Sequence, residues 1–194
     1  CRTARALGDN EALLRARVTP WGTAAGPRAD DGKNPHGTPP AGDPRPVSRT
    51  ALDRAHARGY QVFAAPELEW FYFASSDPTS GPEPLDRGSY FDLTVADRGW
   101  GLRKKTVHAL EDMGIPVEYS HHEDAPSQHE IDLRYTDARS MADTVMTVRQ
   151  IITEVAQRDD VYARFMPTPL ASVQGRVIHT PFSRFSGGTN AFFA

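Results

Sequence analysis

The run ELEWFYF at residues 67–73 constrains the fold more than any other part of the sequence. Aromatic residues favour strands, and residues 60–66 before it are also rich in aromatic and branched side chains. Side chains of a strand alternate between its two faces. The alternation predicts two sets on opposite faces: Glu67, Glu69, Phe71 and Phe73 on one, and Leu68, Trp70 and Tyr72 on the other.

Glu67 and Glu69 place two charged side chains on one face of a strand that is otherwise aromatic. Residues that break the local pattern in this way tend to mark a functional site. Carboxylates that lie close repel each other, and burial raises their pKa unless a positive charge compensates. An edge strand would leave Glu67 and Glu69 in water and explain them without a ligand. The alternative is a hard divalent cation, Mg²⁺ or Mn²⁺, which takes oxygen ligands.

The segment HHEDAPSQHEIDLRY at residues 121–135 adds further ionisable groups. A tight turn at residues 125–127 would make a hairpin and bring Glu123 opposite Glu130. Alternation then places two more polar side chains, Asp132 and Arg134, on the Glu130 side, and directs three others into a core: Ile131, Leu133 and Tyr135. His179 lies in a further expected strand, where a lone histidine is more often structural than a ligand.

Three helices are expected from apolar side chains at helical spacing. The first covers residues 46–58, with a buried stripe of Val47, Ala51, Leu52 and Ala55. The second covers residues 97–113, with a stripe of Leu102, Val107 and Leu110 and a solvated face of Arg103, Lys104 and Lys105. The third covers residues 138–158, capped by Asp137, with a stripe of Met141, Val145, Val148, Ile152 and Val155. Strands are also expected at residues 115–119, 130–135 and 176–185.

Composition narrows the class of protein. A net charge of −3 and a pI near 6.2 argue against binding to nucleic acid or to an anionic membrane, either of which needs a basic surface. One cysteine, Cys1, permits no internal disulfide, and no apolar run is long enough to span a membrane. We therefore expect a cytoplasmic protein. Phosphate-loop, dinucleotide, zinc-protease and serine-nucleophile motifs are absent from the sequence, which leaves a carboxylate metal site and the phosphoryl transfer or hydrolysis that such sites support.

Five motifs, in order, resemble the class I glutamine synthetase family. They are Pro66-Glu67-Leu68-Glu69, the segment LDRGSYFD at residues 85–92, the segment VEYSHHEDAPSQHEIDLRY at residues 117–135, ARFMPTPL at residues 163–170, and GRVIHTPFS at residues 175–183. The resemblance implies an α+β fold. Residues 43–194 would form the N-terminal half of a catalytic domain, a curved antiparallel sheet with helices on one side, and residues 1–42 a remnant of a β-grasp domain with its linker.

The resemblance also implies roles for individual residues. Glu69, Glu123 and Glu130 would bind one Mg²⁺ or Mn²⁺, and Glu67 and His179 a second. Glu118 and Ser183 would contact ATP, and Gln174 and Gly175 the substrate glutamate. The implied reaction phosphorylates the γ-carboxylate of glutamate with ATP, after which ammonia displaces phosphate to give an amide. The family's active sites form between subunits of a dodecamer.

The chain departs from the family pattern at four positions. Arg176 and Val177 follow Gly175 where the family has G-S-G, Pro181 replaces a histidine, and Thr168 replaces a lysine. The chain starts at cysteine and stops where the second half of the catalytic domain would begin, so we expect a fragment that lacks the remaining catalytic groups. Two alternatives stay open: a paralogue that joins glutamate to a polyamine or ethanolamine, and a remnant that keeps the fold without catalysis.

Overall fold

The protein is described as a computed structural model that covers residues 31–40, 42–75, 77, 79 and 81–193. Two compact units appear in it: residues 1–62 together with 183–194, and residues 63–182. Most of the predicted N-terminal remnant, residues 1–42, lies outside the described residues. Its division from the catalytic segment stays a prediction.

The unit of residues 63–182 is built on an antiparallel sheet with the order β3-β4-β2-β6. Its strands are β3 (Val117–His122), β4 (Gln128–Leu133), β2 (Glu67–Phe73) and β6 (Tyr162–Arg164). The short strand β7 (Ile178–His179) pairs with the first residues of β2. β2 therefore lies at the centre, where it hydrogen-bonds to β4 along one edge and to β6 and β7 along the other.

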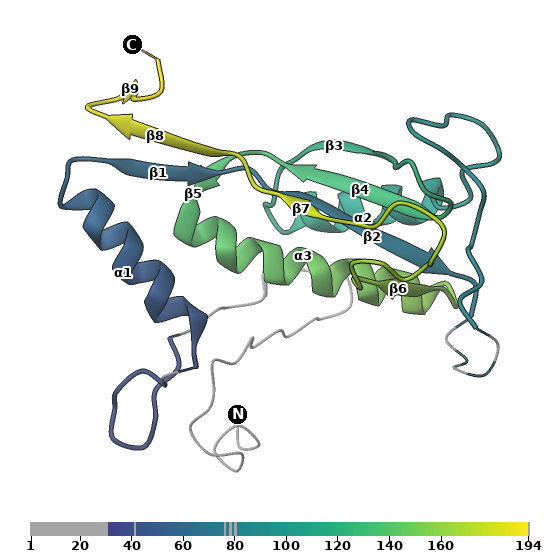
Figure 1. The fold of residues 1–194 in the computed structure, drawn as a ribbon, viewed down its shortest axis with the longest axis horizontal. Coiled ribbons are helices and arrows are strands. Elements are labelled where there is room, and N and C mark those ends of the chain that lie inside the picture. The colour runs from purple at the N-terminus through teal and green to yellow at the C-terminus, as the bar shows by residue number, and fades with distance from the viewer. Residues whose placement is uncertain (1–30, 41, 76, 78, 80, 194) are drawn as a thin grey trace. The chain divides into compact units, whose positions relative to one another are not determined.

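Two helices, α2 (Trp100–Asp112) and α3 (Ala138–Arg158), pack against one face of this sheet (Figure 1). The face is formed by the predicted apolar side of β2 and by Ile131 and Leu133 of β4. The stripe of α3 is buried as expected at Met141, Val148, Ile152 and Val155. This confirms a partial domain of mixed helix and antiparallel sheet with helices on one side.

The opposite face of the sheet has a different composition. Phe71 and Phe73 form a smaller cluster there with Ala125. Glu67 and Glu69 extend from the same face of β2, as the alternation predicts. One strand thus contributes its even-numbered residues to the core and its odd-numbered carboxylates to a surface that no helix covers in the described part of the unit (Figure 1).

Residues 60–73, where the sequence favours strands, form two of them. β1 (Gln61–Ala64) ends before Pro66 and pairs with the two-residue strand β5 (Thr136–Asp137), whereas β2 starts at Glu67. Proline has no N–H to donate to a sheet, so it favours a break at this point. The carbonyl of Pro66 still accepts from the N–H of Leu133, which keeps β2 in register with β4.

The other compact unit contains α1 (Pro44–His56), β8 (Phe182–Ser186), of which Phe182 belongs to the sheet unit, and β9 (Thr189–Asn190). Asp43 caps α1 by accepting from the N–H of Arg45. The predicted buried stripe of this helix is wrong, because α1 has no buried residue and Val47 is 70% exposed. Spacing shows which side chains share a face but not whether another element covers it.

Two further predictions are corrected by burial. Arg103 was expected on a solvated face, yet it is 3% exposed because an acid and a histidine receive its guanidinium inside the protein. Tyr135 was expected in the core, yet it lies beyond the end of β4, is 59% exposed and packs edge-on against Phe63. Among the described residues, no helix is both long and apolar enough to span a membrane.

Candidate metal centre

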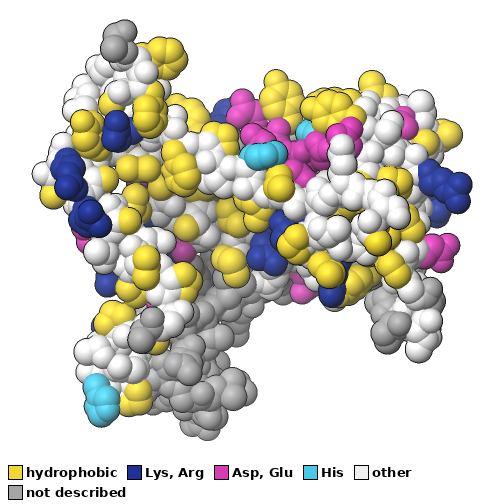
Figure 2. Space-filling view, in the orientation of Figure 1, with side chains coloured by type: hydrophobic (Ala, Val, Ile, Leu, Met, Phe, Trp, Pro, Cys, Tyr) yellow, Lys and Arg dark blue, Asp and Glu magenta, His cyan; other side chains and the backbone are white. Residues whose placement is uncertain are grey.

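A pocket of about 330 Å³ lies on the sheet face that carries Glu67 and Glu69. We call it the carboxylate pocket. It is lined by five acids, two histidines and three aromatic residues: Glu67, Glu69, Glu123, Glu130, Asp132, His121, His179, Tyr90, Phe91 and Tyr119. No lysine or arginine in the described part of the chain lines it. Figure 2 shows the acidic side chains gathered in one patch with histidine among them.

Strand register explains why the acids meet. Glu69 of β2 lies directly opposite Glu130 of β4, and Glu67 lies opposite Asp132. The β3–β4 hairpin turns at residues 125–127, as predicted, and places Glu123 just after β3. Across the hairpin, His121 pairs with Glu130. A period of two on three neighbouring strands therefore directs one set of polar side chains to a single point.

Glu69 is the most firmly held acid of the pocket. Its Oε2 accepts from Gln128 Nε2 at 2.7 Å and from the N–H of Val177 at 3.1 Å. Gln128 also donates to the carbonyl of Gly175 at 3.2 Å, so one amide links three segments of the chain. These bonds fix one carboxylate oxygen, and Oε1 faces His179 Nδ1 at 3.9 Å.

The two histidines each approach a carboxylate. His179 Nδ1 lies 3.3 Å from Glu67 Oε2, and His121 Nε2 lies 3.5 Å from Glu130 Oε2. Phe91 stacks on the His121 ring with centroids 4.2 Å apart, which fixes the plane of the imidazole. His121, Glu130 and Asp132 each offer one ligand atom within 4.8 Å of the others.

Five acids share the pocket with two histidines, and the pKa values of three of these acids are raised. Burial, the contact with Glu123 and the neighbouring Asp132 raise the pKa of Glu130 to about 9. Burial, with the charge of Glu123 adding to it, raises the pKa of Glu69 despite its hydrogen bonds. Burial also raises the pKa of Asp132. Closely spaced carboxylates that take up protons in this way are the donor set that a hard divalent cation would suit, so the residues present fit Mg²⁺ or Mn²⁺.

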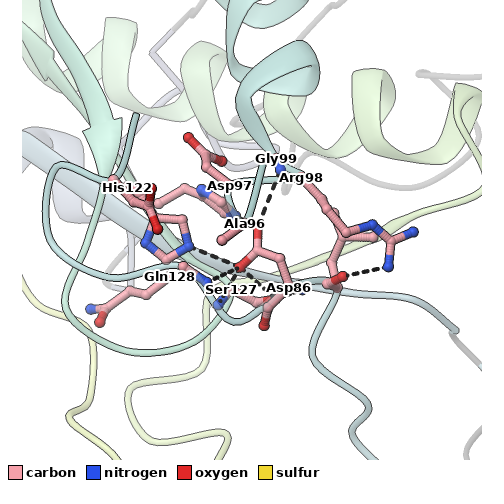
Figure 3. Close-up of polar contacts among 12 residues, drawn as sticks. Asp86, Ala96, Asp97, Arg98, Gly99, His122, Ser127 and Gln128 are labelled. Carbon is pink, nitrogen blue, oxygen red and sulfur yellow. Dashed lines mark hydrogen bonds and ion pairs between the residues drawn. The ribbon is translucent and has the colours of Figure 1, made fainter. Parts of the chain in front are cut away.

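A second ionisable cluster lies beside the pocket and is entirely buried. We call it the Asp86 network, and it consists of Asp86, Asp97, Arg103, His122, Ser127 and His129. Asp86 Oδ1 accepts from His122 Nε2 at 2.9 Å and from the N–H of Ser127 at 3.0 Å (Figure 3). Arg103 makes two bonds to Asp97, at 3.0 and 2.6 Å, and a third to His129 Nδ1 at 2.7 Å.

Asp86, His122 and His129 also fall within metal-binding distance of one another. The chemistry of His129 argues against a cation there. Arg103 can only donate, so His129 Nδ1 must accept and its Nε2 must carry the proton. That N–H points toward Asp86 Oδ2 at 3.8 Å and offers no lone pair to a metal.

Three of the residues predicted to bind substrates, Glu118, Gln174 and Gly175, belong to the same unit as the carboxylate pocket but do not line it. Glu118 is exposed on β3, and Gln174 is exposed in the loop before β7. The carbonyl of Gly175 accepts from Gln128 Nε2, and a Cβ at Gly175 would lie 2.6 Å from the Pro167 carbonyl oxygen. Ser183 belongs to β8 in the other compact unit. Their predicted roles toward ATP and glutamate stay predictions.

Arg176, which departs from the family pattern three residues before His179, does not line the pocket. Its Nε donates to the Phe165 carbonyl at 2.7 Å, and its guanidinium lies over the Phe165 ring. The N–H of the next residue, Val177, still reaches Glu69. Neither Arg176 nor Val177 therefore prevents the backbone from contacting Glu69.

Residues 41–194 match the family model described as "Glutamine synthetase, catalytic domain". The chain belongs to the glutamine synthetase family. Among curated relatives, the glutamine synthetase of Mycolicibacterium smegmatis is 46% identical over 91% of this chain and 41% of its own length. That of Methanosarcina mazei is 42% identical over 91% of this chain and 40% of its own length. The chain thus spans about two fifths of these relatives.

Solved structures agree with the sequence relatives. A cryo-EM structure of Plasmodium falciparum glutamine synthetase matches with a TM-score of 0.74 and 26% identity, covering 84% of this chain and 38% of that one. An apo GmaS structure without ligand matches with a TM-score of 0.72 and 26% identity, covering 87% of this chain and 39% of that one. The fold is equally close to both.

Proposed function

We propose that the carboxylate pocket binds two divalent cations, Mg²⁺ or Mn²⁺, as part of an ATP-dependent glutamate–ammonia ligase of the glutamine synthetase type. Glu69, Glu123 and Glu130 would bind one cation, and Glu67 and His179 the other. The observation that carries the proposal is the pocket itself, in which these five side chains meet and which no lysine or arginine of the described residues lines. Family membership supports the reaction class.

The chemistry of the reaction explains why such a pocket is needed. Phosphoryl transfer from ATP to a carboxylate brings two anions together, and bound cations offset the charge that builds up on the transferring group. In this chain, Glu69 is oriented by Gln128 and Val177 before any cation binds. The remaining catalytic groups would come from the part of the relatives that this chain does not span, and sites would form between subunits of an oligomer in the cytoplasm.

A Mn²⁺ titration followed by calorimetry tests the metal site on this chain. We expect Glu130→Ala and Glu69→Ala to weaken binding at least tenfold, since each removes a ligand oxygen. Glu111→Ala, which removes an exposed carboxylate from α2, is the matched control and should bind as the parent does. Binding that is absent from the parent, or unchanged in both pocket variants, would contradict the proposed site.

The identity of the amine acceptor needs a separate experiment. A γ-glutamyl-amine ligase is the second candidate, because the residues that choose between ammonia and a larger amine would lie largely outside the two fifths of the relatives that this chain spans. Phosphate release by the full-length protein should be measured with glutamate, ATP and either ammonium, ethanolamine or putrescine. Release with an amine but not with ammonium would replace the first candidate by the second.

A further inference from the structure

The β3–β4 hairpin supplies more of the carboxylate pocket than any other segment. Glu123 and Glu130 line the pocket from its two arms, and Gln128 between them orients Glu69 of β2. A shift of this hairpin would therefore displace two proposed ligands and release a third. What holds the hairpin in place decides the geometry of the pocket.

Asp86 holds it from the loop that precedes α2. Its Oδ1 receives His122 Nε2 and the N–H of Ser127, and its own N–H donates to Ser127 Oγ at 2.6 Å (Figure 3). These two hairpin residues lie at either side of the turn: His122 directly precedes Glu123, and Ser127 directly precedes Gln128. A second oxygen, Oδ2, accepts from the N–H of Gly99 at 3.2 Å and ties the carboxylate to the start of α2.

The turn needs this support because its backbone is strained. Ser127 has a φ of 58°, in the left-handed region that residues with a side chain seldom adopt. Both its N–H and its hydroxyl are bonded to Asp86, and its carbonyl accepts from the N–H of Tyr72 on β2. Contacts to the surrounding structure therefore stabilise a conformation that the turn would not hold alone.

The imidazole rings of His122 and His129 pack against the backbone of two glycines. A Cβ at Gly88 would lie 2.6 Å from the His122 ring, and one at Gly99 would lie 2.3 Å from the His129 ring. Each imidazole thus contacts the 85–99 loop directly, and the hydrogen bonds to Asp86 form at this short separation. The loop and the hairpin are fitted to each other over both histidines.

We propose that Asp86 is a positioning residue for the carboxylate pocket, acting through His122 and Ser127 to set where Glu123, Gln128 and Glu130 lie. Asp86 itself is 4% exposed and does not line the pocket, so it acts only through the hairpin. The proposal rests on the proposed metal site and adds to it a residue that touches neither cation nor substrate.

The test compares Asp86→Asn with the parent chain by Mn²⁺ titration and by amide hydrogen exchange. Asparagine keeps the shape but presents an N–H₂ group where a carboxylate oxygen now accepts. We expect Mn²⁺ affinity to fall about tenfold or more with the number of sites unchanged, as for residues that support metal ligands. We also expect the amides of Glu123, Ser127 and Gln128 to exchange at least about tenfold faster, because local opening becomes easier.

Two variants make the result specific. Ser127→Ala removes only the hydroxyl that accepts from the Asp86 N–H, so we expect smaller changes in Mn²⁺ affinity and in hairpin exchange. This variant keeps the test available if Asp86→Asn fails to fold. Asp137→Asn is the control, because it also replaces a carboxylate that accepts backbone N–H groups, here at the start of α3. It should leave both Mn²⁺ affinity and hairpin exchange unchanged.

The outcomes separate this inference from the proposed function. If folded Asp86→Asn binds Mn²⁺ as tightly as the parent does while Glu130→Ala does not, the positioning role of Asp86 is wrong and the proposed metal site still holds. Faster hairpin exchange with unchanged affinity also overturns the link between the hairpin and the pocket. A parent chain that binds no Mn²⁺ overturns the proposed metal site and this inference with it.

Discussion

The carboxylate pocket and the Asp86 network lie side by side on the same hairpin, yet they treat buried charge in opposite ways. In the network, burial penalises the Asp86 carboxylate, but the hydrogen bond and charge of His122 and the hydrogen bond from the N–H of Gly99 keep its pKa below the usual range. In the pocket, burial and the neighbouring carboxylates act in the same direction and raise the pKa of Glu130 to about 9.

The difference lies in the partners rather than in the degree of burial. Glu130 and Asp86 are almost equally inaccessible, at 5% and 4% exposed. Asp86 has a histidine and three backbone N–H groups around it. Glu130 instead faces three acids, Glu69, Glu123 and Asp132, and a histidine 3.5 Å away. The carboxylates of the network therefore have cationic and N–H partners within the chain, whereas the proposed role of the pocket requires a cation from outside. Four predictions test this contrast, from the largest expected effect to the smallest.

Removing the Arg103 guanidinium from the Asp86 network should reduce the stability of the fold more than any other change. Arg103→Leu leaves Asp97 buried without its guanidinium partner and His129 Nδ1 without its donor. We expect a loss of about 3–5 kcal/mol in the free energy of unfolding, typical of a broken buried ion pair. Urea denaturation measures it. Lys104→Leu, at the exposed neighbouring position of α2, is the control and should lose little stability. An equally small loss in Arg103→Leu would show that the Arg103–Asp97 pair does not stabilise the core.

The pocket should make the metal-free protein less stable as pH rises. The folded pKa of Glu130 lies near 9 against 4.5 normally, so between these values the folded chain holds a proton that the unfolded chain has released. Stability then falls with rising pH, by at most about 1.4 kcal/mol per pH unit. Urea denaturation in EDTA at pH 5, 7 and 8.5 should show this decline in the parent and a shallower one in Glu130→Gln. Equal slopes would mean that Glu130 ionises freely.

The close fit of the network should resist even one added methyl group. Gly99→Ala places a Cβ 2.3 Å from the His129 ring, which is held by Arg103 and cannot move without breaking that bond. We expect a loss of about 1–3 kcal/mol, as for overpacked cores. Gly101→Ala, two residues along, meets nothing within 4 Å and should not destabilise. Equal melting temperatures for the two variants would contradict the proposed fit.

A charge pair at the surface should matter least. Lys105 lies on α2 two residues from Arg103 and pairs with Asp159, but its side chain is 57% exposed. Solvent screens such pairs, so Lys105→Ala should cost no more than about 1 kcal/mol in urea denaturation. Thr106→Val, at the next and buried position, offers a comparison on the same helix. If Lys105→Ala lost nearly as much stability as Arg103→Leu, the contribution of an ion pair in this protein would not depend on its burial.

Local pattern predicted the central elements of the fold well. The helix over residues 138–158 and its cap at Asp137 were found at the predicted bounds. The two faces of β2 and the turn at residues 125–127 were also confirmed. These features follow from periodicity and turn chemistry, which act between residues that are close in the chain.

What the sequence missed depends on contacts between distant segments. Arg103 is indistinguishable from Lys104 and Lys105 by spacing, and only the arrival of Asp97 and His129 makes its burial favourable. Asp132 and His121 line the carboxylate pocket, yet neither was given a role. Their signal was present, because alternation places Asp132 on the Glu130 face and hairpin pairing places His121 opposite Glu130. Asp86 gave no such signal before the fold joined it to residues about 40 positions away.

Strand β2 has a consequence for how this segment can vary. Each position from 67 to 73 alternates between the pocket side and the core side, so substitutions act one at a time. Inserting or deleting a single residue at the start of β2 would instead exchange the two sides along the whole strand. Carboxylates would enter the apolar interior and tryptophan would enter the pocket. We therefore expect natural variants of this chain to differ in residue type along β2 but never in its length.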